Sequence, residues 1–218
     1  MQYWKRIVVM QNVVSVFTPA KNKLPLFGVC GLLLSCLSLY PSQVFANDPL
    51  SVTENAANEL TARLMADKAI IKQKPEHLEM LVGDILIPIF DDQLISRLVL
   101  GDYWKTASAE QKIAFIKGFE KILIRTYSSA FAAYDGQEIT FKQPVYNKSK
   151  KKALVRSEIK QKNSPPIQVS YKLRLKGEKW VVYDAEIEGI GVVKSYRAQF
   201  TDEIRKKGFD QMIAGLPS

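Results

Sequence analysis

The spacing of apolar residues changes at Glu138 in this chain of 218 residues, and the new spacing lasts until the last expected helix. Before Glu138, apolar side chains such as Phe119 and Leu123 recur every three or four residues, which is the spacing of one helix face. After Glu138, apolar and polar residues alternate, as they do in strands. Helices followed by strands, with no crossover helix between the strands, predict an α+β fold with a mostly antiparallel sheet of four or five strands and further helices at the C-terminus.

Local signals predict where each element begins and ends. Ser108 and Gln111 have capping-box spacing, so a long helix should begin at Ser108. Pro88 should end or kink the helix that Pro75 opens. The expected helices begin at residue 48 and otherwise cover residues 75–88, 91–100, 108–134 and 192–207. The expected strands cover residues 138–142, 153–161, 167–175 and 180–187.

The first 46 residues have the pattern of a secretory signal peptide. Lys21 and Lys23 precede an apolar stretch, Pro41 breaks that stretch, and Ala46 ends a segment suited to cleavage. We therefore expect cleavage after Ala46 and one domain covering residues 47–218. Two alternatives remain open: Cys36 lies in a sequence that resembles a lipobox, and the apolar stretch could serve as an uncleaved anchor.

Removal of this segment would change both the cysteine content and the charge. Both cysteines lie within it, so the remaining chain could form neither a disulfide nor a thiolate metal site. The segment also holds four basic residues and no acidic one, so the net charge falls from +9 to +5, with 27 basic and 22 acidic residues. An exported, mildly basic protein suits anionic membrane surfaces better than nucleic acid.

Three alternating carboxylates form the first candidate for acid/base chemistry. In a strand they would share one face, and catalysis would need two carboxylates in unlike environments. We therefore favour a solvated outer face, with the apolar residues between the carboxylates facing inward. The carboxylates are Asp184, Glu186 and Glu188, and the opposite face is expected to hold Val181, Tyr183, Ala185 and Ile187.

Other catalytic and cofactor signals are weak. His77 is the only histidine, and its place in the first turn of a helix indicates a surface residue. No catalytic triad exists unless His77 supplies the base, and no second imidazole could join a metal site. Gly189 and Gly191 lack the third glycine of a dinucleotide-binding loop. We predict no catalytic residue, cofactor or metal.

A basic run lies between the first two expected strands. It is either a solvated hairpin loop or a foothold on anionic lipid or an acidic partner, and the sequence leaves both open. The apolar stripes of the helices and strands likewise leave two outcomes: they meet as an ordinary core, or they splay apart around an apolar ligand. The basic residues are Lys148, Lys150, Lys151, Lys152 and Arg156.

Two long segments resemble the MlaC family, which is also described as the toluene-tolerance auxiliary family. They are LVLGDYWKTASAEQKIAFIKGFEKILIRTYSSAFAAYDGQ, residues 98–137, and VYDAEIEGIGVVKSYRAQF, residues 182–200, with the following Gly208. The resemblance runs in order along nearly the whole chain after residue 46. Gly191 departs from it, because many relatives have Ser there, and this loosens the expected turn into the last helix.

The resemblance implies a periplasmic phospholipid carrier without catalytic activity. Its implied partners are an outer-membrane lipoprotein and porin complex and the MCE-type substrate-binding component of an inner-membrane ABC transporter. The implied fold encloses a deep apolar pocket for acyl chains. We expect ten residues to line this pocket: Phe119, Leu123, Tyr127, Phe131, Tyr171, Leu173, Tyr183, Ile187, Val193 and Tyr196. A lipid-modifying hydrolase that uses Glu186 or His77, and a structural adaptor, are the alternatives.

Overall fold

The structure, a computed structural model, describes residues 48–217. Its helices are α2 (Pro49–Ala66), α3 (Lys68–Gln73), α4 (Pro75–Leu86), η2 (Ile87–Ile89), α5 (Asp92–Leu100), α6 (Tyr103–Thr106), α7 (Ala109–Ala132), α8 (Val192–Lys207) and α9 (Phe209–Ala214). Its strands are β1 (Ile139–Tyr146), β2 (Lys152–Ile159), β3 (Ile167–Lys176), β4 (Lys179–Ile187) and β5 (Ile190–Gly191). The expected signal peptide, its cleavage after Ala46 and the lipidation of Cys36 lie outside the described residues.

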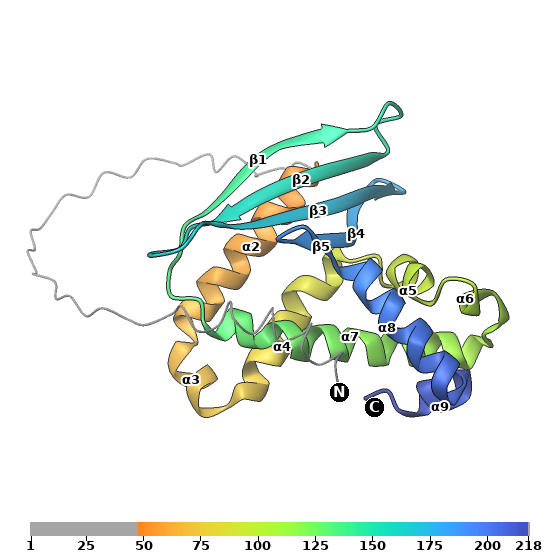
Figure 1. Cartoon of the computed structure of the whole chain (residues 1–218). Helices are drawn as coiled ribbons and strands as arrows, with labels where there is room; N and C mark the ends of the chain where they lie inside the picture. The colour runs from red at the N-terminus through yellow and green to blue at the C-terminus, as the bar shows by residue number, and fades with distance from the viewer. Residues whose placement is uncertain (1–47, 218) are drawn as a thin grey trace, which may run out of the picture.

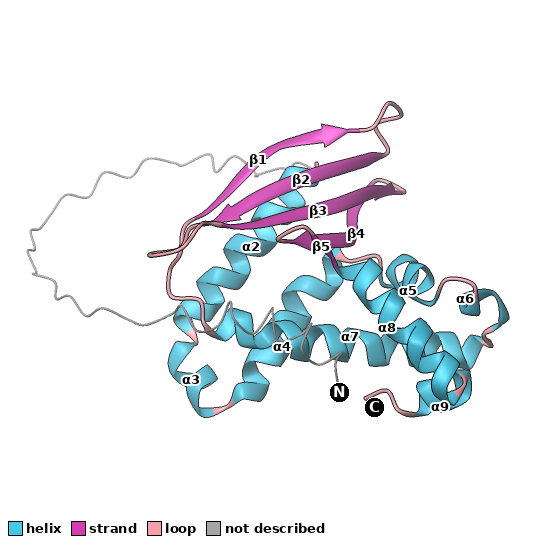
Figure 2. Ribbon diagram, viewed as in Figure 1, coloured by secondary structure: helices cyan, strands magenta, loops and turns pink. Residues whose placement is uncertain are grey.

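The five strands form one antiparallel sheet in the order β1-β2-β3-β4-β5, so each strand pairs with its neighbours in sequence. Figure 1 shows α2 passing behind this sheet, while α4, α7 and α8 lie in a helical layer below it. Figure 2 shows the segregation of helix and strand that the change of period predicts. The α+β fold with a mostly antiparallel sheet is therefore confirmed.

The expected helix boundaries hold where capping signals are strong. The Ser108 hydroxyl accepts a hydrogen bond from the Gln111 N–H at 3.2 Å, and the Gln111 side chain accepts one from the Ser108 N–H at 2.8 Å, which completes the capping box. Pro88 ends α4 by converting the chain into the 3-10 turn η2. The helix expected over residues 192–207 has the same bounds as α8.

The first strand is longer than expected, because Pro144 does not end it. We expected this strand to stop at Lys142, but β1 continues to Tyr146. The pairing of β1 with β2 shifts between Lys142 and Val145, so Pro144 lies in an irregularity of an edge strand. A proline is tolerated in such a position because no ladder hydrogen bond needs its missing N–H.

The expected faces of β4 are partly wrong, because the strand contains a bulge. Leu173 pairs with Val182 and Lys172 pairs with Asp184, so Tyr183 is an extra residue in β4. The bulge reverses the alternation, so Val182 shares the inner face with Ala185 and Ile187. Val181 instead lies on the opposite face, together with Asp184 and Glu186.

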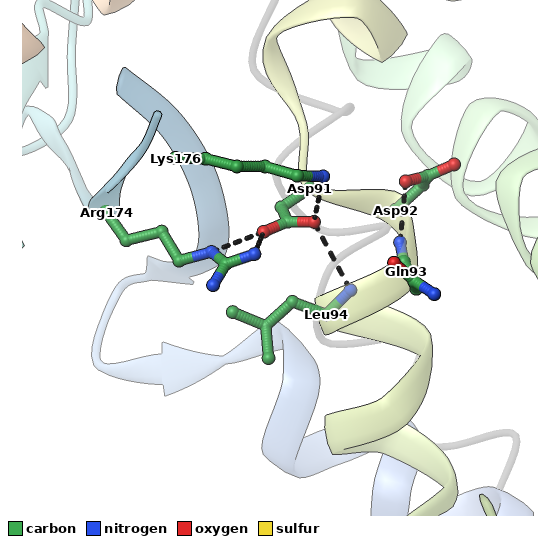
Figure 3. Close-up of polar contacts among 6 residues, drawn as sticks. All are labelled: Asp91, Asp92, Gln93, Leu94, Arg174 and Lys176. Carbon is green, nitrogen blue, oxygen red and sulfur yellow. Dashed lines mark hydrogen bonds and ion pairs between the residues drawn. The ribbon is translucent and has the colours of Figure 1, made fainter. Parts of the chain in front are cut away.

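The buried carboxylate of Asp91 joins the helical layer to the sheet (Figure 3). Its side chain is 0% exposed and forms ion pairs with Arg174, at short range, and with Lys176 at 3.1 Å. The same carboxylate accepts a hydrogen bond from the Leu94 N–H in the first turn of α5. The Asp91 N–H donates to the Val182 carbonyl at 2.8 Å, so the backbone extends the sheet beside β4.

The charge state of Asp91 follows from these contacts. Burial alone would raise the pKa of Asp91, but the hydrogen bonds and charges of Lys176 and Arg174 outweigh burial and hold the pKa below its ordinary value. Because the folded-state pKa is lowered, the stabilisation is present above the unfolded pKa of about 4 and is lost as the pH falls through the folded-state pKa.

We predict that Asp91→Asn lowers the free energy of unfolding by about 2–3 kcal/mol at pH 7, because two cations lose a buried partner while Asn can still cap α5. Asp92→Asn is the matched control, since the Asp92 carboxylate accepts only from the neighbouring Gln93 N–H among its described hydrogen bonds. Urea unfolding measures both variants. The difference between wild type and Asp91→Asn should shrink below about pH 4. Equal stability of the two variants at pH 7 would contradict this role.

Candidate functional site

The buried apolar residues form three clusters rather than one core. The α7–α8 cluster consists of Ile95, Val99, Leu100, Phe115, Phe119, Tyr196, Phe200, Ile204 and Met212. The α2–α4 cluster consists of Ala56, Leu60, Leu64, Leu78, Val82 and Ile85. The sheet cluster consists of Ala153, Val155, Leu173, Trp180 and Val182. Each cluster lies where two or more elements pack directly against each other.

Two consecutive residues at the junction of η2 and α5 connect all three clusters. Ile89 packs against both the α2–α4 cluster and the sheet cluster. Phe90 packs against both the sheet cluster and the α7–α8 cluster. Neither side chain is fully buried, although each touches two clusters. We call the region where these clusters meet the seam.

The long helix α7 changes character along its length. In its first half, Phe115 and Phe119 are 0% and 2% exposed and stack on each other, with ring centroids 5.5 Å apart. Further along, Leu123 packs against the α7–α8 cluster and Ile124 against the α2–α4 cluster, yet both stay partly exposed. Inward-facing apolar residues stay accessible when the neighbouring elements do not close over them. The second half of α7 therefore presents apolar side chains that are only partly buried by their neighbours.

Two tyrosines, Tyr127 on α7 and Tyr196 on α8, interact with each other. Burial raises the pKa of Tyr127, and the neighbouring Tyr196 raises it further. Burial also raises the pKa of Tyr196, against a smaller opposite effect of its hydrogen bond with the Thr126 hydroxyl at 3.2 Å. Both hydroxyls therefore stay protonated across the ordinary pH range, and the Tyr196 O–H donates to the Thr126 hydroxyl.

Most of the ten residues expected to line a pocket belong to one of the three clusters or pack against one. Phe119 and Tyr196 belong to the α7–α8 cluster, and Leu123, Tyr183 and Val193 pack against it. Leu173 belongs to the sheet cluster, Tyr171 packs against it, and Phe131 packs against the α2–α4 cluster. Tyr127 and Ile187 belong to none of the three. Phe119, Leu173 and Tyr196 are therefore core residues in this structure, while the other seven are partly exposed.

The sequence reasoning missed several residues at the seam. Ile89 and Phe90 follow Pro88 in a short apolar run that no helix or strand period explains. Ile124 and Phe141 are also partly buried against a cluster and were not among the expected residues. The available signal was the apolar run of residues 85–90, which continues past the proline that ends the helix.

The three alternating carboxylates have structural partners. The Asp184 carboxylate accepts a hydrogen bond from the Val193 N–H at 3.2 Å and pairs with Lys172 at 2.8 Å. The Glu188 carboxylate accepts from the Gln168 N–H, and Glu188 lies in the turn after β4 with a φ of 50°. The solvated face that we expected is therefore wrong for Asp184, whose side chain is 12% exposed. Asp184 instead caps the start of α8, where Gly191 has no side chain to do so.

His77 does not lie on the surface as expected. Its side chain is 19% exposed, and its Nε2 lies 2.8 Å from the Asp67 carboxylate. The hydrogen bond with His77 is the main reason that the pKa of Asp67 is lowered. This pair ties the start of α4 to the end of α2, and Figure 1 places the α3–α4 corner far from β4, which carries Glu186.

Neither a metal site nor a membrane-spanning helix is found in residues 48–217. No group of three or more His, Cys, Asp or Glu side chains in this range could hold a metal ion. Among the same residues, no helix has the length and apolar character needed to cross a bilayer.

The fold and the seam define a class of protein: an α+β domain in which an antiparallel sheet and a helical layer are joined by partly buried apolar residues. Residues 54–218 match the MlaC protein family, and the chain belongs to that family. The chain is 27% identical over 194 residues to the intermembrane phospholipid transport system binding protein MlaC of Haemophilus influenzae, covering 87% of this chain and 90% of that protein.

Two further proteins resemble the chain. The toluene tolerance protein ttg2D of Pseudomonas putida is 30% identical over 180 residues, which cover 82% of this chain and 83% of that protein. The solved structure of a phospholipid-binding protein from Ralstonia solanacearum, in complex with a phospholipid, superposes with a TM-score of 0.69 at 26% identity. That superposition covers 77% of this chain and 97% of the Ralstonia chain.

We predict that Asp184→Ala lowers the free energy of unfolding by about 1–2 kcal/mol, because α8 loses its only described side-chain cap. Glu186→Ala is the control, since Glu186 lies on the same face of β4 without capping a helix, and its effect should stay within about 0.5 kcal/mol. Thermal or urea unfolding gives both values. If the two substitutions had the same effect, the capping role of Asp184 would be wrong.

Proposed function

We propose that this protein binds the acyl chains of a phospholipid at the seam and carries the lipid through the periplasm. The single observation that carries the proposal is the partly buried apolar surface of the second half of α7, together with Ile89 and Phe90, which between them pack against all three clusters. Membership of the MlaC family supports the same reading, as do a relative named for phospholipid transport and a phospholipid-bound structural neighbour.

The proposed lining combines the expected residues that stay partly exposed with those found at the seam. It consists of Leu123, Tyr127, Phe131, Tyr171, Tyr183, Ile187 and Val193 together with Ile89, Phe90 and Ile124. Apolar side chains would contact methylenes, while the protonated hydroxyl of Tyr127 could donate to a lipid oxygen. Phe119, Leu173 and Tyr196 would shape the interior mainly through packing.

Transport would connect two membranes. We propose that the lipid passes between an outer-membrane lipoprotein and porin complex and the MCE-type component of an inner-membrane ABC transporter. Residues 1–46 would direct export as a signal peptide cleaved after Ala46. The name of the Haemophilus relative, an intermembrane phospholipid transport system binding protein, supports this assignment.

The energetics of lipid binding require partner proteins for both loading and unloading. Sheltering a chain of about 15 methylenes from water is worth on the order of 12 kcal/mol, at about 0.8 kcal/mol each. A lipid in a bilayer is already out of water, so extraction gains far less than this. Release into water would be very slow, and unloading therefore needs a partner that competes for the chains or changes the shape of the interior.

We predict that Ile187→Trp slows phospholipid transfer between vesicles by about 30-fold, because the indole occupies space for two or three methylenes worth about 2 kcal/mol. Ile113→Trp is the matched control, since Ile113 is exposed on α7. A substitution at Leu173 would test packing instead, because Leu173 is fully buried. Unchanged transfer by folded Ile187→Trp would favour a structural adaptor and contradict the carrier.

The alternative function, a lipid-modifying hydrolase, has its own test. We predict that wild type, Glu186→Gln and His77→Gln all transfer phospholipid and release no fatty acid or headgroup. Glu186 and His77 lie on separate elements, and His77 is paired with Asp67, which supports the absence of a shared catalytic site. Turnover by wild type that either substitution abolishes would establish the hydrolase instead.

A further inference from the structure

One end of the sheet concentrates positive charge. The β1–β2 turn and the β3–β4 turn lie side by side there, because Lys152 pairs with Arg174 and the Leu175 N–H donates to the Lys151 carbonyl at 3.0 Å. Figure 1 shows both turns at the same end of the sheet, with the β1–β2 turn projecting away from the helical layer. We call residues 147–152 and 174–179 the cationic end.

The charge balance sets this end apart from the rest of the molecule. Residues 48–217 carry 27 basic and 22 acidic side chains, a net charge of +5. The cationic end, counted with the Asp91 that pairs with two of its bases, holds seven basic and two acidic residues, which is also +5. The remainder of residues 48–217 is therefore neutral on balance, and the excess positive charge of these residues equals that of the cationic end.

The β1–β2 turn is held in a defined shape despite its exposure. The Asn147 side chain accepts hydrogen bonds from the Lys151 and Lys152 N–H groups at 3.1 and 3.0 Å. Lys150 has a φ of 54°, which is in the left-handed region that favours glycine. The hydrogen bonds of the Asn147 side chain hold the turn in this conformation. The lysine side chains of the turn are exposed, so their charges are presented from a fixed backbone rather than from a loose loop.

Exposed apolar residues flank this charge. Val145 is 55% exposed, and Tyr146 is 43% exposed with its ring 5.9 Å from that of Trp180 in an edge-on contact. A tyrosine with an apolar ring and a polar tip suits the interface between water and lipid headgroups. Basic residues beside such a side chain are the usual means by which a protein surface attaches to an anionic membrane.

We infer that the cationic end docks the protein on an anionic bilayer surface through phospholipid headgroups. Six of its seven bases are lysines. Lysine is a flexible point charge suited to a diffuse field, whereas fixed recognition of carboxylates on a protein favours the planar fork of arginine. The inference goes beyond the carrier function and does not depend on it, because a protein can attach to a membrane without carrying a lipid.

Vesicle cosedimentation of the purified protein tests this inference. The vesicles are phosphatidylcholine alone, or phosphatidylcholine with an equal part of phosphatidylglycerol, each at low and at high salt. We expect binding only to the anionic vesicles, with loss at high salt because ions screen the attraction. The triple variant Lys148→Gln, Lys150→Gln, Lys151→Gln should bind about 100-fold more weakly, at about five-fold for each lysine.

A control triple variant separates location from total charge. Lys72→Gln, Lys74→Gln and Lys121→Gln remove the same charge from exposed positions elsewhere, and this variant should keep nearly wild-type binding. Equal loss in the two triple variants would overturn the inference, as would equal binding to neutral and anionic vesicles. Absence of vesicle binding, with binding to an acidic protein that requires these lysines, would assign the cationic end to a protein partner. If the membrane-docking inference fails, the carrier function can still be tested, because vesicle-to-vesicle transfer by the Ile187→Trp and Ile113→Trp variants does not depend on the cationic end.

Discussion

The ion pairs of Asp91 fix the helical layer to the sheet. A carboxylate that is fully removed from water needs charged partners, and Arg174 and Lys176 supply them from β3. Because the same residue caps α5 and pairs its backbone with β4, it sets the position of α5 along the sheet. Ile89 and Phe90 directly precede it, so their contacts with all three clusters depend on this anchor.

The proposed lipid-binding interior would be held by directional contacts as well as by close packing. An ordinary core is held together by filling its space, and a gap in it costs stability. In this structure, directional contacts fix the elements to each other. The Asp91 ion pairs join α5 to β3, and the Asp184 cap joins α8 to β4. In the proposed function, the partly buried apolar side chains of the second half of α7 would face the lipid. This arrangement suits a carrier whose cargo enters and leaves while the fold persists.

The sequence predicted the fold better than it predicted the site. The change of period at Glu138 and the capping box at Ser108 are local signals, and both lead to the observed elements. The bulge at Tyr183 could not be predicted, because it depends on pairing with β3, and it reversed part of the expected face of β4. The short elements α3, α6, α9 and β5 carry too few residues to show a period.

The residues of the interior were predicted by type rather than by position. Apolar stripes identify residues that face inward. The stripes do not show which of these residues are fully buried and which stay partly exposed. Phe119 and Leu123 lie on one stripe of α7, yet only Phe119 is closed over by aromatic neighbours, including Tyr196 and Phe200 at 5.0 and 5.7 Å. The role of Asp184 was hidden for a similar reason, because its partner Val193 belongs to the next element.

The most direct test of a phospholipid-binding interior is native mass spectrometry of the purified wild-type protein. The account predicts a major species heavier than the chain by the mass of one phospholipid, which collisional activation releases as an intact lipid. A spectrum showing only the ligand-free chain, both as purified and after incubation with phospholipid vesicles, would contradict it.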